Sequence, residues 1–130
     1  MLYIVATPIG NLEDTSPRAA RILKEAAAVA SEDTRTTRKL LSHFGISTPL
    51  VAFFQHSGPE RLRQLVERLL RGETIALVTE AGTPGVSDPG GELVSAALDA
   101  GIPVRAVPGP SALAAALSVC GFSTRRVVFD

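Results

Sequence analysis

The sequence predicts a doubly wound α/β fold, in which a mostly parallel sheet of about five strands carries helices on both faces. Short apolar runs alternate along the chain with longer runs in which apolar residues recur every three or four positions. The short runs are apolar throughout rather than at every second position, which is typical of strands covered on both faces. The 130 residues, of which 45% are hydrophobic, suffice for one domain with a substantial core. We therefore expect a single α/β domain over residues 1–130.

Six short runs are candidate strands for this sheet. Leu2–Thr7 and Thr74–Thr79 are the strongest, because they are continuous and rich in apolar side chains. Ala27–Ser31 is weaker, since alanine has little preference for strands. In chain order the candidates are Leu2–Thr7, Ala27–Ser31, Leu50–Phe54, Thr74–Thr79, Val104–Val107 and Arg126–Phe129.

The first two helices are expected between the first three candidate strands. Thr15 or Ser16 can cap a helix that has Pro17 in its first turn. The second helix is expected over Thr34–Phe44, with Gly45 ending it. The side chains of the first helix that should face the core are Ile22, Leu23 and Ala26.

The third expected helix, Glu60–Arg71, has the clearest pattern, because its apolar side chains form one stripe. Ser57 and Glu60 have the spacing of a capping box, and Gly72 is the expected stop. The residues of the stripe are Leu62, Leu65, Val66, Leu69 and Leu70.

Two further helices are expected in the second half of the chain. Asp88 can cap a helix that has Pro89 at its first position and Gly101 at its end. An alanine-rich helix is expected over Ser111–Cys120, ending at Gly121. The inward-facing residues of the helix that Asp88 caps should be Leu93, Val94, Ala97 and Leu98.

Glycine and proline gather in three loops that follow candidate strands, namely Thr7–Leu12, Val78–Gly91 and Val107–Ala112. Ligands of parallel α/β sheets bind outside the carboxyl ends of the strands, so we expect the three loops to line one site. Small residues there would let a ligand lie against the backbone. The alternatives are an ordinary strand-to-helix turn for the first loop, an N-cap role for Asp88 in the second, and helix packing for the third.

A dense polar run, Ser31–Lys39, follows the second candidate strand. Its acidic residues could complement the dipole of the next helix, with its basic residues in solvent. Asp33 and Arg35 are instead candidates to orient a substrate hydroxyl or phosphate, and Asp33 is also a candidate base. His56, just past the third candidate strand, is a third candidate for these roles, whereas His43 lies late in a helix and is expected to be structural.

Composition excludes several classes of protein. The 13 basic and 13 acidic residues leave no net charge, which argues against a protein that binds nucleic acid by charge alone. The single cysteine, Cys120, forms no internal disulfide and fits a reducing compartment. No histidine and cysteine spacing indicates a metal site. Met1–Val5 has no basic leader, so we expect no signal peptide. Proline and glycine interrupt the most apolar stretch, Ala106–Val119, so we expect no membrane span. Together these features lead us to expect a cytoplasmic protein.

Four motifs occur in order along the chain. They are Thr7–Asp14, Ser31–Arg35, Ala81–Pro84 with Ser87–Gly90, and Val107–Ala112. Together they resemble the N-terminal domain of the ribosomal RNA small subunit methyltransferase I group, within the tetrapyrrole methylase superfamily. The resemblance covers nearly the whole chain, and four long motifs in register are specific where a single one would not be.

This resemblance implies an enzyme that methylates the 2′-hydroxyl of a cytidine ribose in small-subunit ribosomal RNA, with the assembled 30S subunit as the expected target. It implies S-adenosylmethionine as the methyl donor, bound between two α/β domains without a metal, and a homodimer. By motif matching, the donor-binding residues are Pro8, Ile9, Gly10, Gly82, Thr83, Pro84, Val86, Ser87, Ser111 and Ala112.

The same resemblance assigns the run Glu32–Arg35 and His56 to the substrate side. Glu80 departs from the group, which usually has aspartate before Ala81, and its extra methylene shifts the reach of the carboxylate. Family members are roughly twice this length, as two domains require. We therefore expect a C-terminal domain beyond Asp130, weak donor binding and no activity in the isolated domain, and RNA attraction that comes from the second domain, the dimer or the assembled subunit.

Two rival functions stay open. A methylase of tetrapyrroles or other small molecules would share the fold, although the run Glu32–Arg35 argues against it. A non-catalytic module that dimerises or binds the donor would share the motifs, and a gene that ends at Asp130 would favour it.

Overall fold

The structure is a computed structural model that describes residues 1–7, 12–53, 58–78 and 90–109. In these ranges, strands and helices alternate along the chain, as the sequence predicts. The strands are β1 (Leu2–Val5), β2 (Ala28–Ser31), β3 (Leu50–Ala52), β4 (Ile75–Val78) and β5 (Val104–Val107), and the helices are α1 (Pro17–Glu25), α2 (Thr34–His43), α3 (Gly58–Leu70) and α4 (Gly90–Asp99), with a short 3-10 helix over Leu12–Asp14.

The five strands form one parallel sheet in the order β3-β2-β4-β1-β5. The last residues of neighbouring strands are level with one another: Val5 is opposite Val107, and Ser31 is opposite Val78. All carboxyl ends therefore meet at one edge, which we call the carboxyl edge. The predicted parallel α/β sheet is confirmed, while the candidate strand Arg126–Phe129 and the candidate helix Ser111–Cys120 lie outside the described residues.

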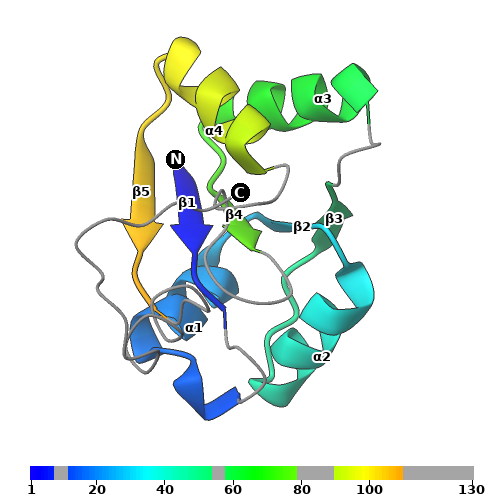
Figure 1. Ribbon diagram of the computed structural model, residues 1–130, viewed down its shortest axis with the longest axis vertical. Coiled ribbons are helices and arrows are strands. Elements are labelled where there is room, and N and C mark those ends of the chain that lie inside the picture. The colour runs from blue at the N-terminus through cyan, green and yellow to red at the C-terminus, as the bar shows by residue number, and fades with distance from the viewer. Residues whose placement is uncertain (8–11, 54–57, 79–89, 110–130) are drawn as a thin grey trace, which may run out of the picture.

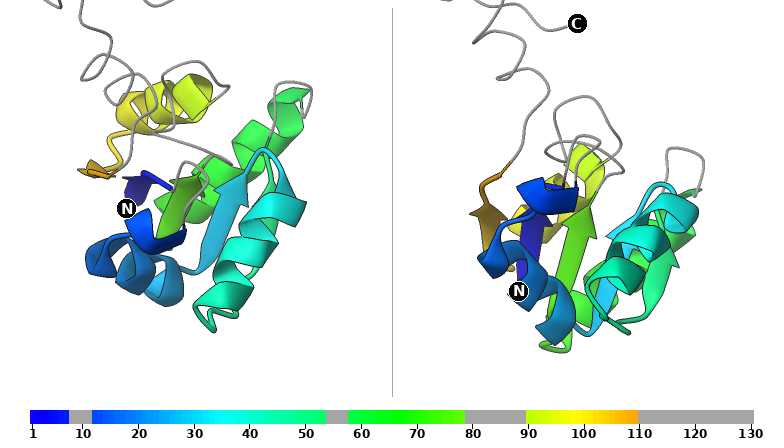
Figure 2. Two further views of the ribbon diagram at one scale, coloured as in Figure 1. Left: turned by 60° about the horizontal axis from the view of Figure 1, so that its bottom comes forward. Right: turned by 90° about the horizontal axis from the view of Figure 1, so that it is seen from below.

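Helices cover both faces of the sheet, with α1 and α2 on one side and α3 and α4 on the other (Figures 1 and 2). The chain steps one way across the sheet from β1 to β2 and β3, then returns to β4 and β5. Right-handed crossovers in opposite directions put their helices on opposite faces. Successive strand residues accordingly join different core clusters, as Val5 does with α1 and α2 and Ile4 with α3 and α4.

The helices of the described chain begin and end where the sequence predicts, within about two residues. Ser16 rather than Thr15 caps α1, because its hydroxyl accepts a hydrogen bond from the Ala19 N–H at 3.0 Å. The glycines that follow α2, α3 and α4 all have positive φ, which lets the chain turn out of each helix. These three stops are Gly45, Gly72 and Gly101.

Two expected core residues are exposed. Leu70 on α3 and Leu98 on α4 are each 60% accessible, although both were expected on the inward stripes. Leu69, directly before Leu70, is 3% accessible. A helix turns by about 100° per residue, so a stripe that centres on Leu65 and Leu69 leaves Leu70 at its margin. In addition, α3 begins at Gly58 rather than Glu60, and the cap residues Ser57 and Asp88 lie outside the described residues.

The contrast between Leu69 and Leu70 gives a matched test of this core. Leu69→Ala should reduce the free energy of unfolding by about 2–5 kcal/mol, because it removes a buried side chain from a packed cluster. Leu70→Ala, one residue later on the same helix, should change it by less than about 0.5 kcal/mol. Urea denaturation followed by circular dichroism measures both, and equal losses would contradict the described orientation of α3.

Candidate functional site

The three glycine- and proline-rich loops begin at neighbouring strands. They follow β4, β1 and β5, which lie side by side in that order in the sheet. The parallel strands end level, so the three loops leave the carboxyl edge at adjacent points. The three loops therefore start close together, and the start of the loop after β1 lies between the starts of the other two. An open α/β sheet binds its ligands at such an edge.

The loops after β1 and β5 touch directly where they leave the sheet. A Cβ atom on Gly109 would lie 3.0 Å from the Cβ of Ala6 and 3.5 Å from its carbonyl oxygen. Ala6 is itself buried, and its N–H donates to the carbonyl oxygen of Val107 at 3.3 Å. Larger side chains at either position would push the two strand ends apart. Ala6 and Gly109 therefore maintain a close approach of two backbones at the carboxyl edge.

A buried pair of hydroxyls holds the turn from β2 into α2. The hydroxyls of Ser31 and Thr37 are 2.5 Å apart, and both residues are buried. The Ser31 hydroxyl also donates to the backbone carbonyl oxygen of Asp33 at 3.1 Å. These contacts satisfy two polar side chains inside the core and fix the direction in which α2 leaves the sheet. Sequence reasoning missed this pair, whose only signal is two small hydroxyl residues on either side of a predicted helix start.

Asp33 is the N-cap of α2. One carboxylate oxygen accepts the backbone N–H of Arg35 at 2.9 Å, and the other accepts the hydroxyl of Thr36 at 3.4 Å. The N–H of Arg35 is the main cause that lowers the pKa of Asp33 below its ordinary value of 3.8. The carboxylate is therefore charged at neutral pH. Its lowered pKa makes it a weak proton acceptor and better suited to orienting a group than to acting as base.

Arg35 extends into solvent beside this cap. Its side chain is 89% accessible, and its Nε lies 3.9 Å from a carboxylate oxygen of Asp33. An ion pair this exposed contributes little to stability. The guanidinium is thus available to an anionic partner at the carboxyl edge. The structure brings Asp33 and Arg35 together there, next to the strand end of β4.

Most other site candidates lie outside the described residues. His56, between β3 and α3 in the chain, lies outside the described residues, and so does Glu80, between β4 and α4. The donor-site candidates outside the described residues are Pro8, Ile9, Gly10, Gly82, Thr83, Pro84, Val86, Ser87, Ser111 and Ala112.

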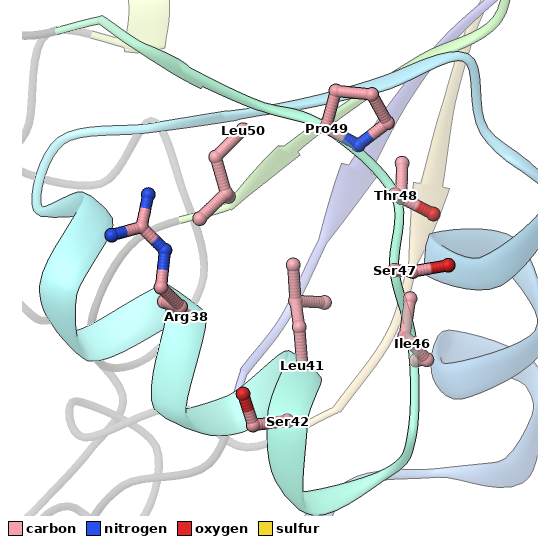
Figure 3. A pocket seen from close by; sticks show the side chains of 8 residues that line it. All are labelled: Arg38, Leu41, Ser42, Ile46, Ser47, Thr48, Pro49 and Leu50. Atoms are coloured by element: carbon pink, nitrogen blue, oxygen red, sulfur yellow. The ribbon is translucent and has the colours of Figure 1, made fainter.

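A pocket of about 260 Å³ lies elsewhere, between α2 and the segment that leads into β3 (Figure 3). Arg38 and Ser42 line it from α2, and Ser47 and Thr48 line it from the facing segment. The pocket is near the amino end of β3, so it is separate from the carboxyl edge. Thr48 closes one side by donating its hydroxyl to the carbonyl oxygen of Leu23, at the end of α1, at 2.7 Å.

In the described ranges, no group of three histidine, cysteine, aspartate or glutamate side chains is placed to hold a metal ion. None of the helices in those ranges has the length and apolar character to cross a membrane.

Comparison with known proteins shows that the chain is similar to methylases. The model of the family described as Tetrapyrrole (Corrin/Porphyrin) Methylases matches residues 1–128. The chain is 52% identical over 129 residues to "Ribosomal RNA small subunit methyltransferase I" of Pseudomonas aeruginosa, covering 99% of this chain and 46% of the relative. A protein of the same name from a Synechocystis species is 51% identical over 130 residues, which is all of this chain and 47% of the relative. The chain spans about half the length of these curated relatives.

Solved structures agree with the fold. Uroporphyrin-III C-methyl transferase from Thermus thermophilus, complexed with S-adenyl homocysteine, is 30% identical to the chain and superposes with a TM-score of 0.65. The match covers 88% of this chain and 47% of that one. The structural relative was thus solved with a ligand of the S-adenosyl class.

The contact between Gly109 and Ala6 can be tested by substitution. Gly109→Ala should destabilise the fold by about 1–3 kcal/mol, because the new methyl meets a buried side chain. Adding Ala6→Gly to the same chain should recover part of that loss, since it removes the opposing Cβ. Urea denaturation of the two single variants and the double variant measures the coupling.

The matched control is Gly91→Ala on α4, where an added Cβ meets nothing within 4 Å. We expect it to be neutral or stabilising by up to about 1 kcal/mol, because alanine favours a helix. Additive effects of Ala6→Gly and Gly109→Ala would show that the two loops do not touch.

The cap of α2 gives a second test. Asp33→Ala should lower the melting temperature by a few degrees, because it removes the acceptor of the Arg35 N–H. Asp33→Asn keeps an acceptor and should stay near the original protein at neutral pH. The folded pKa of Asp33 is lowered, so its charge contributes stability above the unfolded pKa that is lost as the pH falls through the folded pKa. Asp33→Asn should therefore lose less stability than the original protein between neutral pH and pH values below 3.8.

Thermal unfolding at several pH values measures both the lower melting temperature of Asp33→Ala and the weaker pH dependence of Asp33→Asn. Glu32→Ala, an exposed neighbour outside the cap, is the control and should unfold like the original protein. A loss in Glu32→Ala as large as that in Asp33→Ala would refute the capping role.

Proposed function

Because this chain belongs to the tetrapyrrole (corrin/porphyrin) methylase family, we propose that it is the N-terminal domain of an S-adenosylmethionine-dependent ribosomal RNA methyltransferase. The reaction proposed is methylation of a cytidine ribose 2′-hydroxyl in small-subunit ribosomal RNA. The name of the curated relatives and their identity of about half over the whole chain support this substrate over a tetrapyrrole. The remaining half of such an enzyme would form a second domain and close the donor site from the other side.

The strand order of the sheet is the observation that best supports this proposal, because it divides the carboxyl edge into two parts. The loops matched to the donor site leave β4, β1 and β5, which are adjacent. The candidates for the substrate side follow β2 and β3, which are the other two strands. A methyl transfer needs its donor and acceptor side by side, with the acceptor oxygen in line with the methyl group. A sheet whose two parts carry different loops provides that arrangement.

The described residues next to the donor loops fit a donor of this kind. Ala6 and Gly109 are small and bring two backbones together, so a flat or folded ligand can lie against main-chain atoms. We assign Ile9 and Gly10, with Pro8, to one wall and the loop with Gly82 and Thr83 to the methionine end. S-adenosylmethionine supplies a methyl group that its positively charged sulfur activates. The remaining residues proposed to hold it are Pro84, Val86, Ser87, Ser111 and Ala112.

On the acceptor side, we assign Asp33 and Arg35 to positioning the RNA. The Asp33 carboxylate is charged and held by the first turn of α2, so it can accept a hydrogen bond from a ribose hydroxyl at a fixed place. The exposed Arg35 guanidinium can hold a flanking phosphate. Because the lowered pKa of Asp33 disfavours proton uptake, His56 is the better candidate to accept the proton of the hydroxyl.

The whole protein is proposed to work as a homodimer in the cytoplasm, with the assembled small ribosomal subunit as its partner and without a metal cofactor. Donor binding by this chain should be weak, because one domain covers only one side of a ligand that lies in a cleft. The tetrapyrrole methylase of the same fold remains the second candidate, since the solved relative acts on uroporphyrin III by its name.

Calorimetric titration of S-adenosylmethionine tests the donor site. We expect weak binding by this chain and binding at least about tenfold tighter by a two-domain version, because the second domain buries the other side of the donor. Methylation of small ribosomal subunits by the two-domain version should follow, with Arg35→Ala reducing the rate by about tenfold or more at unchanged donor affinity. Arg61→Ala on α3 is the matched control and should keep the full rate.

If neither version binds S-adenosylmethionine, the methyltransferase proposal is refuted. Methylation of a porphyrinoid but not of ribosomal subunits would establish the second candidate instead.

A further inference from the structure

Charged residues are divided unevenly between the helices on the two faces of the sheet, although the chain as a whole has no net charge. The helices α1 and α2 together contain six basic residues and one acidic residue, a net charge of +5 with His43 counted as neutral. The helices α3 and α4 contain three basic and four acidic residues, a net charge of −1. The two helical layers therefore present very different fields to an approaching polyanion.

The two layers also differ in how many of their basic side chains form ion pairs. On and after α3, Arg63 pairs with Glu60 and Glu67, and Arg68 pairs with Glu73 at 3.0 Å. On α1 and α2, only Arg35 has an ion pair with another described residue. We call the other five basic side chains of these helices the basic face; all are exposed, and none has an ion pair in the described part of the chain. They are Arg18, Arg21, Lys24, Arg38 and Lys39.

The helical spacing gathers these side chains on the outer side of the layer. Basic residues recur on α1 every three residues, which is a rise of about 4.5 Å per step. Helices α1 and α2 lie on one face of the sheet (Figure 1). Their apolar side chains are buried in one core cluster, and their basic residues are exposed. Acidic residues precede both helices in the neighbouring turns, where they complement the amino ends of the helix dipoles. The bodies of the two helices are left positive.

The surface beside α2 is hollowed, between that helix and the segment that leads into β3, and serine residues line the hollow. Arg38 borders the pocket of about 260 Å³, together with Ser42 of α2 and Ser47 of the facing segment (Figure 3). The far side of that segment is tied to α1, because the Thr48 hydroxyl donates to the carbonyl oxygens of Leu23 and Lys24. One guanidinium and two serine hydroxyls at a hollow can contact the phosphates and sugars of a nucleic acid strand.

We propose that the basic face binds the phosphate backbone of the RNA substrate and that α2 leads the strand from this face to Asp33 and Arg35 at the carboxyl edge. This inference rests on the proposed function and adds the docking surface to it. It also replaces the expectation that all RNA attraction comes from outside this domain, since a neutral chain can carry one positive layer.

The test uses this chain and a fluorescein-labelled single-stranded RNA of mixed sequence, with binding followed by fluorescence anisotropy over a range of salt concentrations. The triple variant Arg21→Gln, Arg38→Gln and Lys39→Gln should bind RNA about tenfold or more weakly at low salt. The slope of log affinity against log salt should fall by about 2, because each lost phosphate contact to a single strand contributes about 0.7.

The control is a triple variant with the same change in charge on the α3 side of the molecule, Arg61→Gln, Arg63→Gln and Arg71→Gln. It should bind RNA within about twofold of the original chain and with the same salt slope. Circular dichroism checks that both variants are folded, and calorimetry with S-adenosylmethionine should give one affinity for all three proteins.

Equal weakening by both triple variants, no weakening by the first, or no RNA binding by the original chain would each overturn the inference. Binding to anionic phosphatidylglycerol vesicles in the absence of RNA binding would overturn it in favour of a membrane surface. Loss of S-adenosylmethionine binding in every protein, with RNA binding still dependent on the basic face, would refute the proposed methyl transfer and leave the docking surface standing.

Discussion

Burial of the parallel strands on both faces is the constraint on which the rest of the structure depends. Each strand has only three or four residues, and its successive side chains join different core clusters. A shift of one residue in register would exchange those two sets, so the pairing is strongly specified. Fixed register in turn brings the carboxyl ends level, as at Val5 and Val107. Every loop of the candidate site starts from that edge.

The sheet order then decides which loops meet. Because β1 lies between β4 and β5, three loops that are far apart in the sequence leave the sheet together. Ala6 and Gly109 show how close the approach is, since a single added methyl would bring two Cβ atoms within 3.0 Å. Small residues beside the proposed donor loops thus have a packing role at the carboxyl edge.

Structural and functional roles coincide at the turn from β2 into α2. Asp33 caps the helix, and the cap lowers the pKa of its carboxyl group and holds the charge in place. The buried hydrogen bond between the hydroxyls of Ser31 and Thr37 fixes the same turn from its core side. The sequence offers a charge that complements the dipole of the next helix as the alternative to a site role for Asp33. The structure makes Asp33 the N-cap of that helix, and this geometry is compatible with a site role, because a capping carboxylate at the carboxyl edge is already oriented. The helix that follows carries Arg38 and Lys39, the two residues that α2 contributes to the basic face.

The sequence by itself determined the local structure: the alternation of strands and helices, the glycine stops and a helix start at Thr15 or Ser16 follow from residue types a few positions apart, and the structure selected Ser16 as the cap. It also placed the polar run after β2 and the glycine-proline loops after their strands. Only the tertiary structure decided the strand order, the contact of Ala6 with Gly109, and the exposure of Leu70 and Leu98. Local periodicity records which residues share a face, whereas these features depend on which element packs against that face. Such contacts join residues far apart in the chain, so no short pattern of residues encodes them.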